Sequence, residues 1–222
     1  MLALMEYQLK KIERSTPAGN WDRAPWDRVP ALRLENFMGQ RPAHLPQVDV
    51  KAAWDDEAVR VIFRVEDRYV RAVAAADQGA VWQDSCVEFF FTPGPEVSPG
   101  YFNLETNCGG VKLFHHQKTF GVDRVLVAAD DLERIEIFHS LPRIVEPEME
   151  GPITWQLEYR LPVDILAKYA PFIPPAPGVT WRGNFYKCAD KTSHPHWLTW
   201  NRIERPTPAF HVPECFGALK FL

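Results

Sequence analysis

The sequence predicts an all-β fold, an antiparallel β-sandwich with one short helix, and three observations lead to this prediction. Short runs rich in Val, Ile, Phe, Tyr and Trp recur along the chain and alternate apolar with polar residues, as strands with one buried face do. The 20 prolines cluster between these runs, because proline cannot donate a hydrogen bond to a sheet ladder. Only residues 163–170 have a helical pattern, about two turns long. Many strands and hardly any helix are typical of two packed antiparallel sheets.

The strand-like runs lie between Pro- and Gly-rich turns. The expected strands cover residues 48–54, 58–67, 85–91, 101–108, 111–116, 133–140, 153–162, 180–188 and 217–222. In the second of these runs, Val59, Val61, Phe63 and Val65 share one face, because side chains in a strand point alternately to its two sides. We expect this face to lie in the core.

The chain is expected to form a single domain over residues 1–222. It contains no internal repeat, no low-complexity tract and no linker that divides it, and β-sandwiches of this length are often single domains. The first forty residues carry Trp21, Trp26 and Phe37 among polar residues. We expect this segment to wrap over one end of the sandwich.

The composition is that of a soluble protein with neither a nucleic-acid nor a membrane partner. Acidic residues number 29 and basic residues 25, the formal net charge is −4, and there is no basic run. No segment approaches the roughly 18 consecutive apolar residues of a membrane helix. The N-terminus lacks the basic start, apolar stretch and cleavage site of a signal peptide. The chain as given is therefore expected not to be exported, and no compartment is assigned.

The four cysteines are widely spaced, with no CxxC pair. They are Cys86, Cys108, Cys188 and Cys215. Three lie in or beside strand-like runs, which favours buried free thiols. A single disulfide is the alternative if the protein is exported.

The stretch VWQDSCVEFFFTP (81–93) places an unusual pair of side chains on one face. Read as a strand, it directs Val87 and Phe89 to the core face, and Trp82 and Glu88 to the opposite face. A Trp ring can stack on the apolar C–H face of a sugar, and a carboxylate can bind neighbouring hydroxyls. The pattern therefore indicates a polar ligand site that includes an aromatic surface.

Two further strands, 101–108 and 180–188, also carry polar residues opposite their apolar face. These residues are Asn103, Glu105, Asn107, Arg182 and Asn184. Asn is depleted in strands, so its presence here needs a reason. One interpretation is that these side chains extend the site of Trp82 and Glu88. The other is that they form solvated outer faces with cross-strand Glu–Arg pairs.

Several segments together resemble a known family of sugar-binding modules. In order, they are VKAAWDDEAVRVIFRVED, VWQDSCVEFFFTP, YFNLETNCGG and WRGNFYKC…HWLTWNRI…FHVPECFGALKFL, over roughly residues 20–222. They are similar to family 9 carbohydrate-binding modules. The D-S-x-V-E-x-F core at 84–90 is the most specific part of the match, and FHVPECFGALKF is the next. The resemblance implies a DOMON-like β-sandwich that binds a mono- or oligosaccharide without catalysis and without a cofactor.

The resemblance also implies which residues bind the sugar, which in the family lies between two Trp side chains while polar residues fix the hydroxyls. Trp82 matches the first Trp, and Glu88 matches a hydroxyl-binding carboxylate. The second Trp is expected in HWLTWNRI, and Trp200 is favoured over Trp197 because Asn201 follows it. The looser matches on neighbouring strands are Asn107 and Arg182, and Asn184 and Asn201 are also expected to bind the sugar hydroxyls. Because such modules usually accompany enzymes, a separate glycan-degrading enzyme is an expected partner.

Two other functions remain open at this point. Glu88 and Glu105 could act as the carboxylate pair of a glycosidase, in which the separation of the two carboxyl groups decides the stereochemical outcome. A DOMON-like fold could instead bind haem or another planar ligand through a His or Met side chain. No nucleophile elbow, phosphate-binding loop or cofactor motif is present, which favours a binding module over an enzyme.

The metal-binding signals are weak. Family relatives hold a structural calcium ion, and Asp55 and Asp56 in WDDE (54–57) are chemically suited to one, although a hairpin turn explains these acids equally well. Cys188 with His194 and His196 resembles a zinc ligand set only loosely, because no second Cys lies close by in the sequence.

Overall fold

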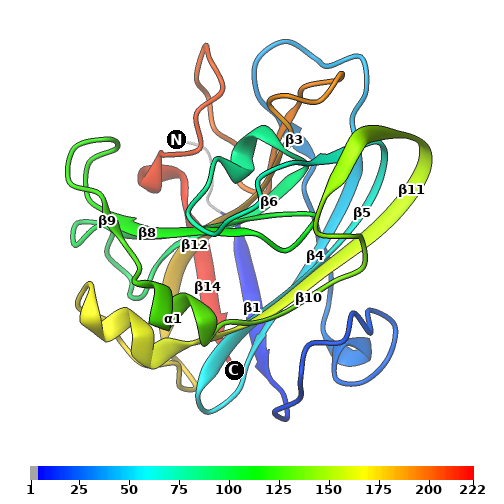
Figure 1. The fold of residues 1–222 in the computed structure, drawn as a ribbon. Coiled ribbons are helices and arrows are strands. Elements are labelled where there is room, and N and C mark those ends of the chain that lie inside the picture. Colours follow the sequence, from blue (N-terminus) through cyan, green and yellow to red (C-terminus); the bar gives the residue numbers. More distant parts are fainter. Residues whose placement is uncertain (1–4) are drawn as a thin grey trace.

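In the computed structural model, which describes residues 5–222, two β-sheets pack face to face (Figure 1). The first sheet contains β2 (Leu32–Arg33), β4 (Gln47–Trp54), β5 (Ala58–Ala72), β10 (Glu136–His139) and β11 (Val145–Pro162). The second contains β3 (Asn36–Phe37), β6 (Cys86–Thr92), β7 (Tyr101–Asn107), β8 (Lys112–Gln117), β9 (Val125–Leu126), β12 (Thr180–Cys188), β13 (Trp197–Thr199) and β14 (Gly217–Phe221). The predicted all-β sandwich is confirmed.

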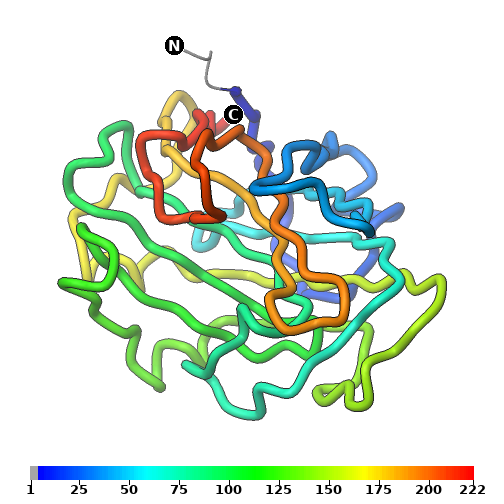
Figure 2. The backbone as a smooth tube through the Cα atoms, turned by 90° about the horizontal axis from the view of Figure 1, so that it is seen from above, coloured from blue at the N-terminus to red at the C-terminus, as the bar shows by residue number. Residues whose placement is uncertain are grey.

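Strand β1 (Glu6–Lys11) connects the two sheets, and the sequence did not predict it. It pairs in parallel with β14 through Glu6–Leu9 and in parallel with β4 through Lys10 and Lys11. The remaining strand pairs are antiparallel, as expected. Figure 2 shows the C-terminal end of the chain beside β1, where the Leu222 amide donates to the Leu9 carbonyl at 3.0 Å. The first and last strands, β1 and β14, therefore lie side by side.

The main core lies between the two sheets. The predicted inward face of β5, with Val59, Val61, Phe63 and Val65, is fully buried in it. From the second sheet, Phe89 and its neighbours on β6 pack against this face; Phe63 and Phe185 lie 6.2 Å apart between ring centroids. The period-two pattern thus identified the core side of the strands correctly.

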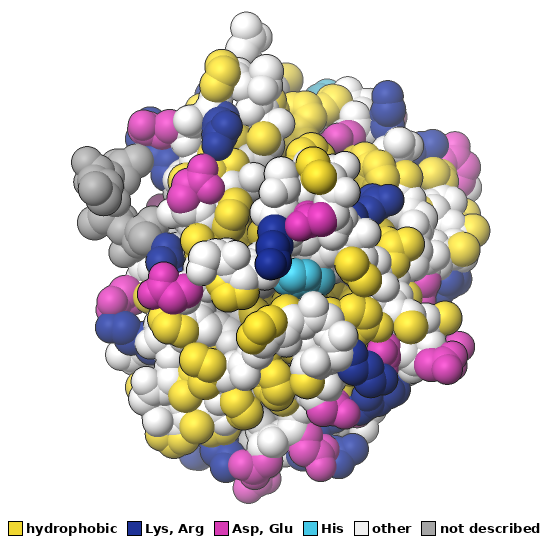
Figure 3. Space-filling model, turned by 90° about the vertical axis from the view of Figure 1, so that its left-hand side faces the viewer, with side chains coloured by type: hydrophobic (Ala, Val, Ile, Leu, Met, Phe, Trp, Pro, Cys, Tyr) yellow, Lys and Arg dark blue, Asp and Glu magenta, His cyan; other side chains and the backbone are white. Residues whose placement is uncertain are grey.

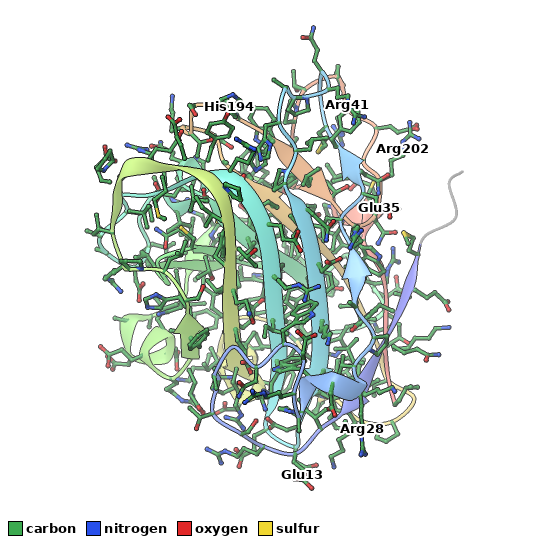
Figure 4. All side chains as sticks on the ribbon, turned by 90° about the vertical axis from the view of Figure 1, so that its right-hand side faces the viewer. Glu13, Arg28, Glu35, Arg41, His194 and Arg202 are labelled. Atoms are coloured by element: carbon green, nitrogen blue, oxygen red, sulfur yellow. The ribbon has the colours of Figure 1, made fainter. Side chains whose placement is uncertain are left out.

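The N-terminal segment covers the outer face of the first sheet instead of one end of the sandwich. Trp21 and Trp26 are buried there against Ala53 and Ile62. The Trp26 indole donates to the Glu158 carboxylate at 3.0 Å. Trp26 therefore covers the polar outer face of β11 at Glu158. Figure 4 shows this blue segment crossing the long strands at the end where Glu13 and Arg28 are labelled, whereas His194 lies at the other end.

The helical segments are short. They are η1 (Trp26–Arg28), η2 (Val81–Gln83), α1 (Ala129–Glu133), η3 (Val163–Lys168) and η4 (Pro213–Cys215). The predicted helix at 163–170 is the 3-10 segment η3. The strand expected at 133–140 is shorter, because α1 ends at Glu133 and β10 begins only at Glu136. No helix among the described residues is long and apolar enough to cross a membrane.

The cysteines are free thiols, as favoured. Cys86, Cys108 and Cys188 are buried, and Cys215 is half-buried. The expectation of one domain over residues 1–222 stays a prediction, with residues 1–4 outside the described part of the chain.

Candidate ligand-binding site

A cavity of about 610 Å³ lies over the outer face of the second sheet. Its floor is formed by β6, β7 and β8, and its walls come from η2, the 118–124 loop after β8, the start of β13 and the loop of residues 205–212. Figure 3 shows the side of the molecule that carries β8 and β9, where apolar side chains surround a histidine beside a basic side chain. The volume falls within the range of about 300–1,000 Å³ that is usual for small-molecule sites.

Strand register places the polar floor residues in rows. Glu88 on β6 lies directly opposite Glu105 on β7, and Glu105 lies opposite Leu113 on β8. The next row joins Phe90, Asn103 and His115. Because alternate residues of a strand share a face, all of these side chains lie on the side away from the core.

Two tryptophans line the cavity, and both are connected to Asp190. Trp82, which is 36% exposed, lies in η2, and its carbonyl accepts a hydrogen bond from the Asp190 amide at 3.3 Å. Trp197 begins β13, and its indole donates to the Asp190 carboxylate at 2.8 Å. Asp190 therefore fixes the position of one tryptophan through its backbone and of the other through its side chain.

The floor contains buried polar atoms without a hydrogen-bond partner. Glu88 Oε1 accepts from the Cys188 thiol at 3.1 Å, but Glu88 Oε2 has no partner, and neither ring nitrogen of His115 has one. Glu105 Oε1 accepts from the side-chain amide nitrogen of Asn103 at 2.6 Å, and the side-chain oxygen of Asn103, Oδ1, has no partner. Buried polar groups in proteins nearly always have partners, so these atoms indicate a polar ligand or water in the cavity.

Burial favours the uncharged form of the titratable groups in the floor. Burial, with the nearby Cys188 and Glu105, raises the pKa of Glu88 well above its usual range. Burial also raises the pKa of Glu105 to about 8 and lowers the pKa of His115 to about 3. The shifts of all three groups favour their neutral forms, which suits hydroxyl groups better than a charged ligand.

Additional aromatic and basic groups surround the opening. Phe120 stacks on His211 with ring centroids 4.0 Å apart, and His211 Nδ1 is hydrogen-bonded to the Tyr101 hydroxyl at 2.8 Å. Arg124 and Arg205 also line the cavity. The opening thus combines flat apolar surface with guanidinium donors.

The structure brings together two of the predicted site residues, Trp82 and Glu88. The reason given for Trp82 was incorrect, because residues 81–83 form a 3-10 turn and β6 begins only at Cys86. The two side chains meet because the turn carries Trp82 over the strand that holds Glu88.

The other predicted tryptophan, Trp200, lies in the main core. It is 2% exposed and packs against Tyr7 and Phe185, with ring centroids 6.4 and 6.0 Å away. The preference for it over Trp197 is therefore corrected: Trp197 lines the cavity. Trp197 is paired with Cys188 on β12, so it shares the outer face, whereas Trp200 has the opposite parity.

The remaining predicted residues hold loops in place and do not line the cavity. Asn107 accepts from the amides of Gly109 and Val111, in the turn after β7. The Arg182 guanidinium donates to the Phe216 carbonyl.

Asn184 and Asn201 form a reciprocal pair away from the cavity. The Asn184 side chain donates to the Asn201 carbonyl at 3.1 Å and accepts from the Asn201 amide at 2.9 Å. The Asn201 side chain also accepts from the Met5 amide at 2.8 Å. Of the strand asparagines that needed a reason, Asn107 and Asn184 are thus explained by the backbone segments they connect, whereas Asn103 donates to Glu105 in the floor.

The candidate metal residues are dispersed. Both carboxylate oxygens of Asp55 accept hydrogen bonds from Arg160 at 2.9 Å, and the exposed Asp56 pairs with Lys11. Calcium at this place stays a prediction. His196 contacts Lys187 at 2.8 Å, so it does not join Cys188 in the loosely suggested zinc set.

Sequence reasoning missed several cavity residues. They are His115, Gln117, Phe120, Arg124, Asp190, Phe210 and His211. His115 and Gln117 share parity with Leu113, opposite Glu105, so pairing of the two strands would have revealed them. The others lie on loops whose position over the sheet no local pattern indicates.

Comparisons with known proteins agree on one family. The family model described as "Carbohydrate-binding family 9" matches residues 22–221. A candidate carbohydrate-binding protein from Bacteroides uniformis is 30% identical, with 99% of this chain and 100% of that chain covered and a TM-score of 0.89. No significant match was found among curated proteins.

Two further solved structures share the fold at lower identity. Both are family 9 modules from Caldicellulosiruptor kristjanssonii. The glucose complex is 16% identical with a TM-score of 0.65, and 98% of this chain and 96% of that chain are covered. The cellotriose complex is 15% identical with a TM-score of 0.67, and the coverage is 98% and 93%.

Proposed function

The chain belongs to carbohydrate-binding family 9, and we propose that it binds a neutral carbohydrate, without catalysis, in the cavity over β6, β7 and β8. One observation carries the proposal: Trp82 and Trp197 line the same cavity as Glu88, whose Oε2 atom is buried without a partner. An aromatic surface beside unpaired acceptors is what a sugar ring, with its apolar faces and polar edge, requires.

The tryptophans supply the apolar contact. Trp82 is partly exposed, so it can cover a sugar face without reorganisation of the core. Trp197 is held by its hydrogen bond to Asp190, which restricts its ring before a ligand arrives. A fixed aromatic side chain loses little conformational entropy on binding, and this favours stacking.

The floor supplies directed hydrogen bonds. Glu88 and His115 offer unpaired polar atoms, and burial favours the neutral form of both groups. A neutral carboxyl group can donate one hydrogen bond and accept others, which matches adjacent sugar hydroxyls. The related Caldicellulosiruptor modules, captured with glucose and cellotriose, make these two sugars the natural first probes.

The glycosidase alternative is less well supported. Glu88 and Glu105 lie opposite each other on one floor, and burial disfavours the ionised form of both. A retaining enzyme needs one ionised carboxylate as nucleophile, and an inverting enzyme needs one as base. Hydrolysis of an aryl glycoside that is lost in Glu105→Gln would support this alternative.

A planar ligand such as haem is the other alternative. His115 is a cavity residue that could act as axial ligand, because neither of its ring nitrogens has a hydrogen-bond partner. A Soret band in the purified protein would support it. A separate glycan-degrading enzyme as partner stays a prediction.

The proposal is tested by titrating glucose, cellobiose and cellotriose into the protein and measuring binding by calorimetry and by tryptophan fluorescence. We expect saturable binding that weakens at least about tenfold, or about 1.4 kcal/mol, in Trp82→Ala and in Trp197→Ala. Phe37→Ala is the matched control, since Phe37 is 37% exposed, much like Trp82, but does not line the cavity. Heat-stable, folded protein that binds none of these sugars, or binding unchanged in both Trp variants, would overturn the proposal.

A further inference from the structure

Two buried thiols and a carboxylate converge at the floor of the cavity. Cys86 on β6 lies directly opposite Cys188 on β12, and Glu88 follows two residues later on the same face as Cys86. One donor atom from each of the three residues lies within 4.8 Å of the others. The Cys188 sulfur is 3.1 Å from Glu88 Oε1. Among the described residues, this is the group of three or more His, Cys, Asp or Glu side chains whose potential ligand atoms all lie within 4.8 Å of one another.

The donor set suits a thiophilic divalent cation. Zinc binds cysteine sulfur at about 2.3 Å and carboxylate oxygen at about 2.0–2.2 Å, which in a tetrahedral site places two sulfurs about 3.8 Å apart. The observed spacing needs a contraction of about 1 Å or less, within reach of side-chain rotation. Calcium and magnesium prefer oxygen ligands, so two sulfurs argue against them.

The cluster is both enclosed and reachable. All three residues are at most 2% exposed, so competing water is largely excluded. Glu88 and Cys188 nevertheless line the cavity, so an ion can enter from that side. The thiols at present contact the Val87 carbonyl at 3.7 Å, the Trp82 carbonyl at 3.4 Å and Glu88 Oε1 at 3.1 Å, and a thiol is a weak donor. A bound metal ion replaces these weak hydrogen bonds with sulfur–metal and oxygen–metal bonds.

We propose that Cys86, Cys188 and Glu88 bind a thiophilic divalent cation of the zinc type, with a fourth position open to the cavity. As the two sulfur–metal bonds and the carboxylate–metal bond form, the two thiol protons and the Glu88 carboxyl proton pass to the solvent, so no oxidant or reductant is needed. This site goes beyond sugar binding. Because it uses Glu88, bound metal is expected to compete with a sugar for the floor.

The test uses the reduced full chain, with four thiols verified by titration, and Co²⁺ as a coloured probe that Zn²⁺ then displaces. We expect a saturable thiolate-to-cobalt charge-transfer absorption, complete at one equivalent and removed by Zn²⁺. Cys86→Ala and Cys188→Ala should each reduce this absorption at least tenfold. Cys108→Ala is the matched control, because Cys108 is an equally buried thiol outside the cluster.

Alanine is chosen because it adds no polar group to an apolar environment, and circular dichroism verifies that each variant folds. The wild-type spectrum decides the question even if a variant does not fold. Absence of the charge-transfer band in reduced wild-type protein would overturn the proposal. So would a band that persists in both folded cluster variants or is lost equally in Cys108→Ala.

Discussion

Glu88 and Glu105 are directly opposite each other on β6 and β7, and both side chains are buried in the floor of one cavity, 2% and 5% exposed. Their hydrogen bonding differs. Glu105 Oε1 accepts from the Asn103 amide at 2.6 Å, whereas Glu88 Oε1 accepts only from the Cys188 thiol, a weak donor, and Glu88 Oε2 is buried without a partner. Two carboxyl groups of equal burial are therefore unequal as ligand groups, and Glu88 has the greater free capacity.

The first prediction follows from this inequality. Glu88→Ala should weaken glucose binding by about 1–2 kcal/mol, or about 5- to 30-fold, because a ligand hydrogen bond is lost. Glu105→Ala should weaken it less, because part of the capacity of Glu105 is used within the protein. Calorimetric titration of both variants measures the difference. Equal losses, or a larger loss for Glu105→Ala, would contradict the assignment.

The second prediction concerns Asp190 as a positioning residue for both tryptophans. Asp190→Ala removes the acceptor of the Trp197 indole and should weaken glucose binding about three- to tenfold. Asp190→Asn keeps an acceptor oxygen and should restore most of the affinity. The anisotropy of tryptophan fluorescence should fall in Asp190→Ala and recover in Asp190→Asn. Affinity that falls equally in both variants would indicate that the charge of Asp190, and not its hydrogen bond, matters.

The third prediction is a pH dependence of stability caused by Glu105. Burial raises the pKa of Glu105 to about 8, whereas an unfolded glutamate titrates near about 4.3. The fold thus favours the protonated form. Its contribution to stability is complete below about pH 4 and is lost as the pH rises through about 8.

Glu105→Gln cannot ionise, so it should avoid this loss. Relative to wild type, its Tm should rise between pH 5 and pH 9 by more than the roughly 2–4 °C that corresponds to 1 kcal/mol. Glu105→Gln also removes the contribution of Glu105 to the raised pKa of Glu88, which changes the pH dependence in the same direction. Thermal melts at several pH values measure the difference, and a Tm difference that does not change with pH would contradict the buried-carboxyl explanation.

The parts of the fold and of the candidate site that the sequence predicted are those that depend on local patterns. Alternation within β5 identified its buried face, and the pair Trp82 and Glu88 was visible within one short stretch. Strand β1 was missed because its parallel partners, β14 and β4, lie far away in sequence. A short run at a chain end carries no signal for such pairing.

The choice between Trp197 and Trp200 depended on strand register that the sequence does not display. The two residues are three positions apart and therefore face opposite sides, so one of them had to be in the core. The register Cys188 with Trp197 settles which one. The loops that carry Phe120 and His211 over the sheet depend on long-range packing, and no local pattern places them.

The fourth prediction separates a core tryptophan from a ligand tryptophan. Trp200 packs against Tyr7 and Phe185 and is 2% exposed, so Trp200→Ala should cost about 3–5 kcal/mol of folding stability. Trp82→Ala should cost far less, because Trp82 is 36% exposed. Chemical denaturation gives both values. If Trp200→Ala were nearly as stable as wild type and yet lost sugar binding, its assignment to the core would be wrong.

The fifth prediction concerns Asp55, whose two carboxylate oxygens both accept hydrogen bonds from Arg160 at 2.9 Å. Both side chains are buried, and without Asp55 the Arg160 guanidinium keeps only its contacts to the more exposed Glu57 and Glu136. Asp55→Ala should therefore destabilise the fold by about 2–4 kcal/mol, because two hydrogen bonds between buried charged groups are lost. Asp56→Ala is the control, because Asp56 is exposed and its pair with Lys11 contributes about 0–1 kcal/mol.

Since Arg160 already neutralises Asp55, a chelator should not change the Tm of the wild-type protein through this residue. The measurement is a pair of thermal melts, one in excess calcium and one after treatment with a calcium chelator. A Tm that falls on chelation in wild type, but not in Asp55→Ala, would show that calcium and not Arg160 is the partner of this carboxylate. Equal Tm values would leave the ion pair as the explanation for the burial of Asp55.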